Sequence, residues 1–311
     1  MLILIDYIKM EQSEHLCAYV SSRGLMKSCD VFPPNPVSSI RRCYDYDWHT
    51  LKSHATVYVP SSAIPDFIKR VWPTIKVPII LVSGDCDETI PYDIFPSQEA
   101  ATTFVKDARL IAWFAQNMVP FHSKTFQIPI GMDYHTLSAS AHPWGPQQTP
   151  LKQEQALLAL RERANVQKPL IHANFHFSMK TRYGKDRETA IQEIPKALIY
   201  YQPTPVPRFL TWASQREYAF VASPWGGGLD CHRTWEALAL GCYPILHSSE
   251  LDHMFRDLPV LIVNAWSDVT QERLDAFLKE QEGTPKVIPE KLFLKYWVSK
   301  INLFKGAPVA S

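Results

Sequence analysis

The residues best suited to chemistry lie in one short stretch of the chain. Three consecutive glycines, Gly226–Gly228, are followed by Asp230, Arg233 and Glu236. Because glycines have no Cβ, they let backbone N–H groups approach a ligand closely. A helix beginning at residue 231 would direct its free N–H groups and the positive end of its dipole at an anion. A guanidinium in the first turn of that helix suits a phosphate group.

The spacing gives the three side chains separate expected roles. We expect Asp230 to cap the N-terminus of the helix. Glu236 follows Arg233 by three residues on the same helical face, where its carboxylate could accept hydrogen bonds from sugar hydroxyls. Phosphate and hydroxyl groups together indicate a nucleoside diphosphate or a nucleotide sugar. The alternative is a tight turn followed by a surface ion pair. The stretch has neither a Walker loop nor the spaced GxGxxG fingerprint, so ATP hydrolysis and NAD chemistry are disfavoured.

The run from Ser223 to Ile245 resembles the carboxyl-half motif of exostosin-like glycosyltransferases and of the related ribitol xylosyltransferases, and the likeness covers residues 220–277. This resemblance implies a GT-B fold, in which the second of two facing domains holds a UDP-sugar. It also implies inversion at the anomeric carbon and no required metal. Arg233 would then face the diphosphate, and Glu236 the ribose or the donor sugar. Xylose is the first guess for that sugar.

Short apolar runs alternate with helical stretches along the whole chain, as expected for parallel α/β sheets. Expected strands are residues 1–5, 55–59, 77–83, 110–114, 126–130, 170–175, 197–201, 218–223, 243–247 and 260–263. Expected helices are residues 63–71, 97–106, 150–163, 186–194, 208–215, 231–240, 271–280 and 290–302.

A segment rich in proline, 139–150, divides these elements into two sets. We therefore predict an α/β protein with two facing Rossmann-like domains, mainly parallel sheets and a cleft between them. Residues 1–145 form the predicted acceptor-side domain, and residues 146–311 the predicted nucleotide-sugar-binding domain. The last helix can pack back on the first domain.

Candidates for a general base follow two of the expected strands. Ligands in such sheets bind at the carboxyl ends of the strands, and an inverting transfer needs a base that removes the proton of the acceptor hydroxyl. The first candidates are Asp85 and Asp87, which follow strand 77–83, and we prefer Asp87 of the two. Asp133 and His135, after strand 126–130, are their rivals. Asp85 and Asp87 also match the DxD pattern of metal-dependent transferases, which is an alternative mechanism.

The loop after strand 170–175 supplies further donor-binding candidates. Asn174 begins it, and Arg182 and Arg187 could neutralise the departing UDP. The alternative is a solvated basic loop. His232, next to Arg233, completes the predicted donor-binding set. No metal site is expected, because His172 and His176 lie four apart in a strand pattern and not on one helical face. Segment 44–49, which mixes aromatic and acidic residues, is either a sugar-binding surface or an ordinary loop.

Composition limits the partners that the chain can have. Its 311 residues include 32 Lys and Arg and 31 Asp and Glu, so the net charge of +1 gives no argument for nucleic acid or an anionic membrane. No apolar run approaches the roughly 20 residues of a spanning helix. The opening run lacks a basic leader, so we expect no signal peptide. The six scattered cysteines indicate reduced thiols and a soluble cytoplasmic protein.

Together these features predict a UDP-sugar-dependent glycosyltransferase, hexosyl or pentosyl, that acts on a glycan hydroxyl. Its partners would be the UDP-sugar donor and the glycan acceptor, with no cofactor and no required divalent metal. Two alternatives stay open. One is a metal-dependent transferase that uses Asp85 and Asp87, and the other is a non-catalytic module that binds a nucleotide sugar or a glycan.

Overall fold

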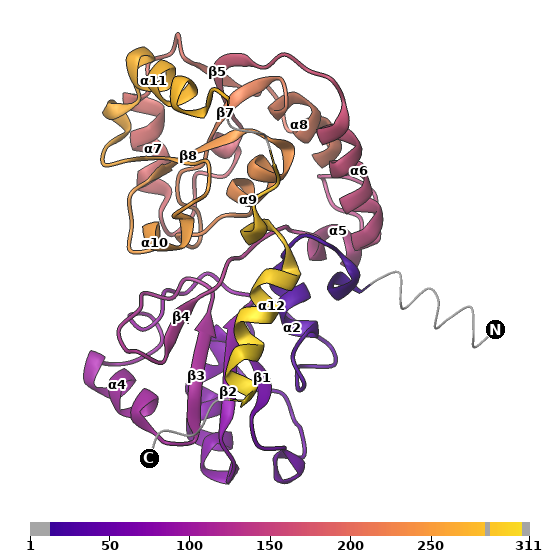
Figure 1. The fold of residues 1–311 in the computed structure, drawn as a ribbon, viewed down its shortest axis with the longest axis vertical. Helices are drawn as coiled ribbons and strands as arrows, with labels where there is room; N and C mark the ends of the chain where they lie inside the picture. The colour runs from indigo at the N-terminus through magenta and orange to yellow at the C-terminus, as the bar shows by residue number, and fades with distance from the viewer. Residues whose placement is uncertain (1–12, 284–286, 307–311) are drawn as a thin grey trace, which may run out of the picture.

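The computed structural model describes residues 13–283 and 287–306, which contain two parallel sheets (Figure 1). The first has the order β1-β2-β3-β4 and consists of β1 (Ala55–Pro60), β2 (Ile79–Gly84), β3 (Leu110–Ala115) and β4 (Thr125–Gln127). The second has the order β6-β5-β7-β8-β9 and consists of β5 (Lys168–Ala173), β6 (Ile199–Tyr201), β7 (Tyr218–Ala222), β8 (Tyr243–His247) and β9 (Leu261–Val263). Every strand pair is parallel, which confirms the predicted fold class of two Rossmann-like sheets. The expected strand 1–5 lies outside the described residues.

The helices connect and cover these strands. They are α2 (Ser22–Lys27), α3 (Ile64–Asp66), α4 (Gln98–Lys106), α5 (His135–Ala139), α6 (Pro150–Glu162), α7 (Gly184–Glu193), α8 (Arg208–Gln215), α9 (His232–Leu240), α10 (Asp252–Phe255), α11 (Gln271–Gln281) and α12 (Leu294–Asn302). The expected helix 63–71 is confirmed as helical, but only Ile64–Asp66 (α3) is α-helix: Phe67–Val71 continues it as a π-helix, and a 3-10 turn over Trp72–Thr74 follows. Pro73 lies in that last turn, and it lacks the N–H that a continuing helix would need.

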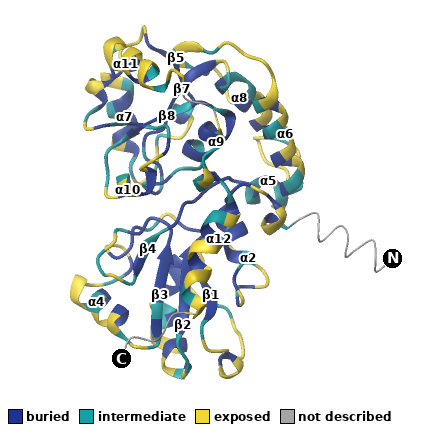
Figure 2. Cartoon of the chain, viewed as in Figure 1, coloured by how far each residue is buried: buried dark blue, intermediate teal, exposed yellow. Residues whose placement is uncertain are grey.

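The continuous apolar runs form strands because both faces of the sheets are covered. All residues of β1, β2 and β7 are buried, whereas the outer faces of helices such as α4 and α11 are exposed (Figure 2). A strand buried on both faces loses the alternation of polar and apolar residues that an exposed strand shows. This burial places loops, not strand faces, in contact with solvent and ligand.

Two segments of the described residues cross between the sheets. Helix α6 leads into the second sheet and packs against α8 and α9, and α12 returns to lie beside α2 (Figure 1). The Leu294 amide donates to the carbonyl of Ala18 at 2.8 Å, and the ring of Phe304 packs on those of Phe114 and Phe126. The last helix thus stabilises the first half of the molecule.

Direct hydrogen bonds hold the carboxyl ends of the two sheets face to face. The Asp230 carboxylate accepts from the Ile130 amide at 2.7 Å, and the Asp230 amide donates to Oδ1 of Asn117 at 3.0 Å. Arg182 of the second half also forms an ion pair with Asp93 of the first half. The loops that follow β2, β3 and β4 in the first sheet are therefore brought against those that follow β5 and β7 in the second.

Candidate functional site

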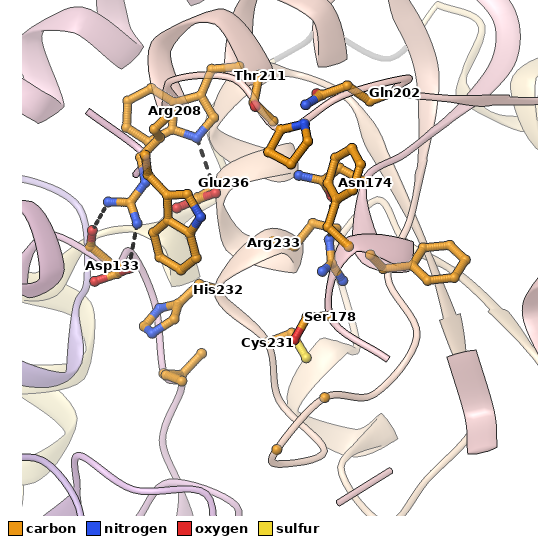
Figure 3. Close-up of a pocket in the computed structure, with 18 of the residues that line it drawn as sticks. Asp133, Asn174, Ser178, Gln202, Arg208, Thr211, Cys231, His232, Arg233 and Glu236 are labelled. Carbon is orange, nitrogen blue, oxygen red and sulfur yellow. Dashed lines mark hydrogen bonds and ion pairs between the residues drawn. The ribbon is translucent and has the colours of Figure 1, made fainter. Parts of the chain in front are cut away.

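A cavity of about 620 Å³ lies between the two halves. Its lining includes Asp87 and Asp133 from the first half and Asn174, Arg233 and Glu236 from the second. Figure 3 shows Asp133, Asn174, Arg233 and Glu236 around the cavity. Its volume lies within the usual range of roughly 300–1,000 Å³ for small-molecule sites. The predicted position of a ligand at the carboxyl ends of the strands therefore coincides with a real cavity.

Helix α9 begins at this cavity without a side-chain cap. Cys231 is the N-cap residue, with extended backbone (φ −127°, ψ 138°) and no capping hydrogen bond from its side chain. The first amides of a helix have no partner within it, so they can bind an anion. The helix ends where expected, at Gly241, whose left-handed conformation (φ +78°) favours glycine.

The predicted capping role of Asp230 is wrong. Its carboxylate is buried and accepts hydrogen bonds from the Ile130 amide and, at 2.8 Å, from Nε1 of Trp235. Burial raises the pKa of Asp230 to about 6. Asp230 therefore connects the two halves of the molecule and leaves the start of α9 open.

Arg233 presents an unsatisfied cation to the cavity. Its Nε donates to Oδ1 of Asn174 at 2.9 Å, which orients the guanidinium, whereas its buried Nη1 has no hydrogen-bond partner among the described residues. Burial lowers the pKa of Arg233 to about 10, so the group stays charged at neutral pH. A buried guanidinium with a free donor is costly unless a ligand pairs with it.

Glu236 does not form the alternative surface pair with Arg233. Its Oε2 accepts from Nε1 of Trp212 at 3.1 Å, and the side chain lines the cavity (Figure 3). The indole fixes one carboxylate oxygen, so the position of the group is set before a ligand arrives. Its predicted role as an acceptor for sugar hydroxyls stays a prediction.

The three glycines have a structural role that sequence reasoning missed. A Cβ on Gly227 would overlap the carboxylate of Asp87, and one on Gly228 would lie 2.7 Å from Nδ2 of Asn117 and 3.1 Å from the Asp87 carbonyl oxygen. A Cβ on Gly226 would lie 2.6 Å from Nη2 of Arg187. The absence of side chains in this loop therefore lets the two halves approach each other.

Replacing Gly228 by alanine should destabilise the closed arrangement of the two halves. The added methyl would meet both the Asn117 side chain and the Asp87 backbone, and overpacking of this kind costs about 1–3 kcal/mol. We expect a lower denaturant midpoint in chemical unfolding. Gly306→Ala is the matched control, because a Cβ there meets nothing within 4 Å. Equal midpoints for both variants would contradict the close approach.

The two arginines predicted to neutralise UDP are engaged elsewhere. Arg182 is paired with Asp93 and lies outside the cavity lining, which corrects its predicted contact with the donor. Arg187 lines the cavity, but its Nε donates to the Trp225 carbonyl at 2.9 Å and its Nη1 to the carbonyls of Phe175 and Ser178. Arg187 therefore fixes the loops around the cavity.

The candidate bases Asp85 and Asp87 have different surroundings. Asp87 lines the cavity, and desolvation there raises the pKa of its carboxyl. Asp85 is buried outside the cavity lining, accepts from Oγ of Ser38 at 2.9 Å and lies 3.7 Å from Nε of Arg23. Asp85 is thus not positioned to act as the base, and it does not join Asp87 in the cavity as the DxD alternative requires.

Asp133 and His135 are neighbours, but neither is a free base in the cavity. Burial alone would raise the pKa of Asp133, but the Arg208 guanidinium holds this pKa well below its usual range through a buried ion pair (Figure 3). Nδ1 of His135 lies 3.1 Å from Oδ1 of Asp133, burial lowers the pKa of His135, and the ring is outside the cavity lining. His232 does line the cavity, and its Nδ1 lies 2.7 Å from the Gly131 carbonyl oxygen.

Sequence reasoning also missed part of the cavity wall. Arg208 begins α8 and lies under the ring of Trp144, 5.2 Å from its centroid, and Gln202 follows β6. No sequence motif predicted these residues, because they are distant from the glycine loop in sequence and reach the cavity only in the folded chain. Segment 44–49, by contrast, does not line the cavity: Trp48 packs on Tyr44 and Phe67 in the first half.

No protein-family model and no curated protein sequence matches the chain. Among solved structures, an Escherichia coli trehalose-6-phosphate protein bound with UDP-2-fluoro glucose is 14% identical, with a TM-score of 0.38 over 82% of this chain and 72% of that one. An α,α-trehalose-phosphate synthase (UDP-forming) from Burkholderia vietnamiensis is 12% identical, with a TM-score of 0.42 over 84% and 73%. The exostosin-like resemblance stays a prediction.

Within the described part of the chain, no helix is both long enough and apolar enough to cross a membrane. The cytoplasmic location stays a prediction.

Proposed function

We propose that the chain is a UDP-sugar-dependent glycosyltransferase that transfers its sugar, with inversion, to a hydroxyl of a glycan. The observation that carries this proposal is the pairing of the uncapped start of α9 with the unsatisfied guanidinium of Arg233 at one cavity. Backbone amides and a guanidinium together match the oxygens of a diphosphate. Because the net charge of the chain is only +1, this local cluster must supply the attraction.

The polar wall beyond Arg233 supports a complete nucleotide. Gln202 lines the cavity, and its buried Oε1 has no partner among the described residues, whereas its Nε2 donates to the Thr204 carbonyl at 2.9 Å. A fixed amide with a free acceptor can receive the N3–H of uracil. Glu236 is then available for ribose or sugar hydroxyls. Xylose stays the first guess for the transferred sugar.

Asp87 is the group that we assign as the base. It removes the proton of the acceptor hydroxyl while that oxygen attacks the anomeric carbon from the face opposite UDP. The bond between that carbon and the diphosphate oxygen breaks, and the charge that develops on UDP meets Arg233 and the first amides of α9. This division of roles needs no metal ion on the diphosphate, and the separation of Asp85 from Asp87 favours it over the metal-dependent alternative.

Calorimetric titration with UDP, ADP and a panel of UDP-sugars tests the donor assignment. We expect UDP to bind. ADP should bind at least about tenfold more weakly, because adenine has no N3–H to donate to the free Oε1 of Gln202. Failure of UDP and all UDP-sugars to bind would contradict the proposal.

Release of UDP from the best donor in the presence of candidate glycans tests the transfer, with and without excess EDTA. We expect full activity in EDTA. Loss of activity in EDTA would favour the metal-dependent mechanism, and donor binding without any release of UDP would favour a non-catalytic binding module.

A further inference from the structure

A second cluster of side chains lies at the edge of the cavity and has no role in the transfer proposed above. Asp133 and His135 come from the first half of the chain and His232 from the start of α9. One ligand atom from each lies within 4.8 Å of the others. About a hundred residues separate His232 from the other two in the sequence, so no spacing motif could reveal the cluster.

The geometry of the pair Asp133 and His135 fits two ligands of one ion. Nδ1 of His135 lies 3.1 Å from Oδ1 of Asp133 as an ion pair, and this contact is not among the hydrogen bonds of the described residues. Two ligands of a tetrahedral Zn²⁺, each about 2.0–2.1 Å from the ion, lie roughly 3.3 Å apart. The observed separation is close to that value.

Outer contacts already orient the cluster. Nδ1 of His232 meets the Gly131 carbonyl oxygen at 2.7 Å, which favours a proton on Nδ1 and a lone pair on Nε2. Oδ2 of Asp133 is held by Arg208, and its Oδ1 accepts from the Thr136 amide at 3.0 Å. Histidine ligands of metals usually donate their second ring nitrogen to a carbonyl or carboxylate in this way, and ligating carboxylates are hydrogen-bonded in turn.

We propose that Asp133, His135 and His232 form a binding site for a divalent transition-metal ion, with Zn²⁺ as the ion that the ligand set fits best. Two imidazoles and one carboxylate suit zinc, and three protein ligands leave a fourth position for water. Asp133 and His232 also line the cavity, so the site lies at its edge. The ion would join the two halves of the molecule without contributing to the metal-free transfer, so its binding does not depend on the proposed function.

Zinc binding is tested by titrating ZnCl₂ into the full chain after chelator treatment and exchange into chelator-free buffer. We expect one Zn²⁺ per chain, with a dissociation constant of about 1 μM or below. Zn²⁺ should also raise the thermal unfolding midpoint, because it binds only the folded chain. Co²⁺ offers a second readout, since a tetrahedral site gives it visible absorption bands.

His135→Ala and His232→Ala should each weaken Zn²⁺ binding at least tenfold and abolish the Co²⁺ bands. His253→Ala, which removes an exposed histidine on α10, is the matched control and should bind as the wild type does. Unfolding curves in EDTA show whether each variant is folded. Wild-type binding weaker than about 100 μM, or unchanged affinity in both cluster variants, would overturn the proposal.

Discussion

Replacing Arg233 by alanine is expected to weaken UDP binding by at least tenfold. The guanidinium is oriented by Asn174 and has a buried donor, Nη1, that no described residue satisfies. A hydrogen bond to a charged group contributes about 1.5–3 kcal/mol, and about 1.4 kcal/mol corresponds to a factor of ten in the dissociation constant. The variant leaves the amides of α9 in place, so weaker binding is expected to remain detectable by calorimetry.

Two further variants define the cause of that loss. Arg233→Lys keeps the charge but replaces a planar fork by a point charge, so its affinity should fall between those of the wild type and Arg233→Ala. Arg273→Ala removes an exposed arginine of α11 and should leave UDP affinity unchanged. If Arg233→Ala binds UDP as the wild type does, the diphosphate is not at the start of α9.

The sequence predicted those parts of the fold that depend on local pattern. β1, β2 and β7 are buried on both faces, and their uninterrupted apolar residues are typical of parallel strands. Gly241 and the helix before it followed from local rules as well. The expected helix at 63–71 is helical as well, but the spacing of apolar residues did not show that its second part, Phe67–Val71, winds as a π-helix.

The sequence predicted only those residues of the site that lie close to one another along the chain. Arg233 and Glu236 lie on one helix and both line the cavity. Asp230 shows the opposite case: local rules favour aspartate as an N-cap, but the Ile130 amide, a hundred residues away, takes its carboxylate. Such a contact exists only once the two halves meet.

The same limit explains the glycine loop. Its sequence indicates freedom of the backbone, but not which groups approach it. The neighbours are Asp87 and Asn117 from loops of the other sheet. Arg208 and Asp133 form a buried ion pair across 75 residues, so an expected base became a fixed structural anion.

Replacing Asp87 by asparagine should lower turnover by roughly 10²–10⁴ and spare donor binding. Asparagine has the shape of aspartate but cannot accept the acceptor's proton, and loss of a general base lowers a rate by roughly 10²–10⁴. UDP release with the best donor and acceptor measures the rate, and calorimetry measures UDP affinity. Glu99→Gln neutralises an exposed carboxylate of α4 and should change neither. Undiminished turnover in Asp87→Asn would direct attention to His232, which also lines the cavity.

The pH dependence of turnover gives an independent test of the same residue. Desolvation in the cavity raises the pKa of Asp87 above its ordinary value of 3.8. Because a base must be ionised to act, the rate should fall as the pH is lowered through this raised pKa and level off above it. The acidic limb should therefore lie above pH 3.8. It should disappear from the residual rate of Asp87→Asn, because the titrating group is gone. An identical limb in that variant would show that another group controls the rate, whatever the variant's loss of activity.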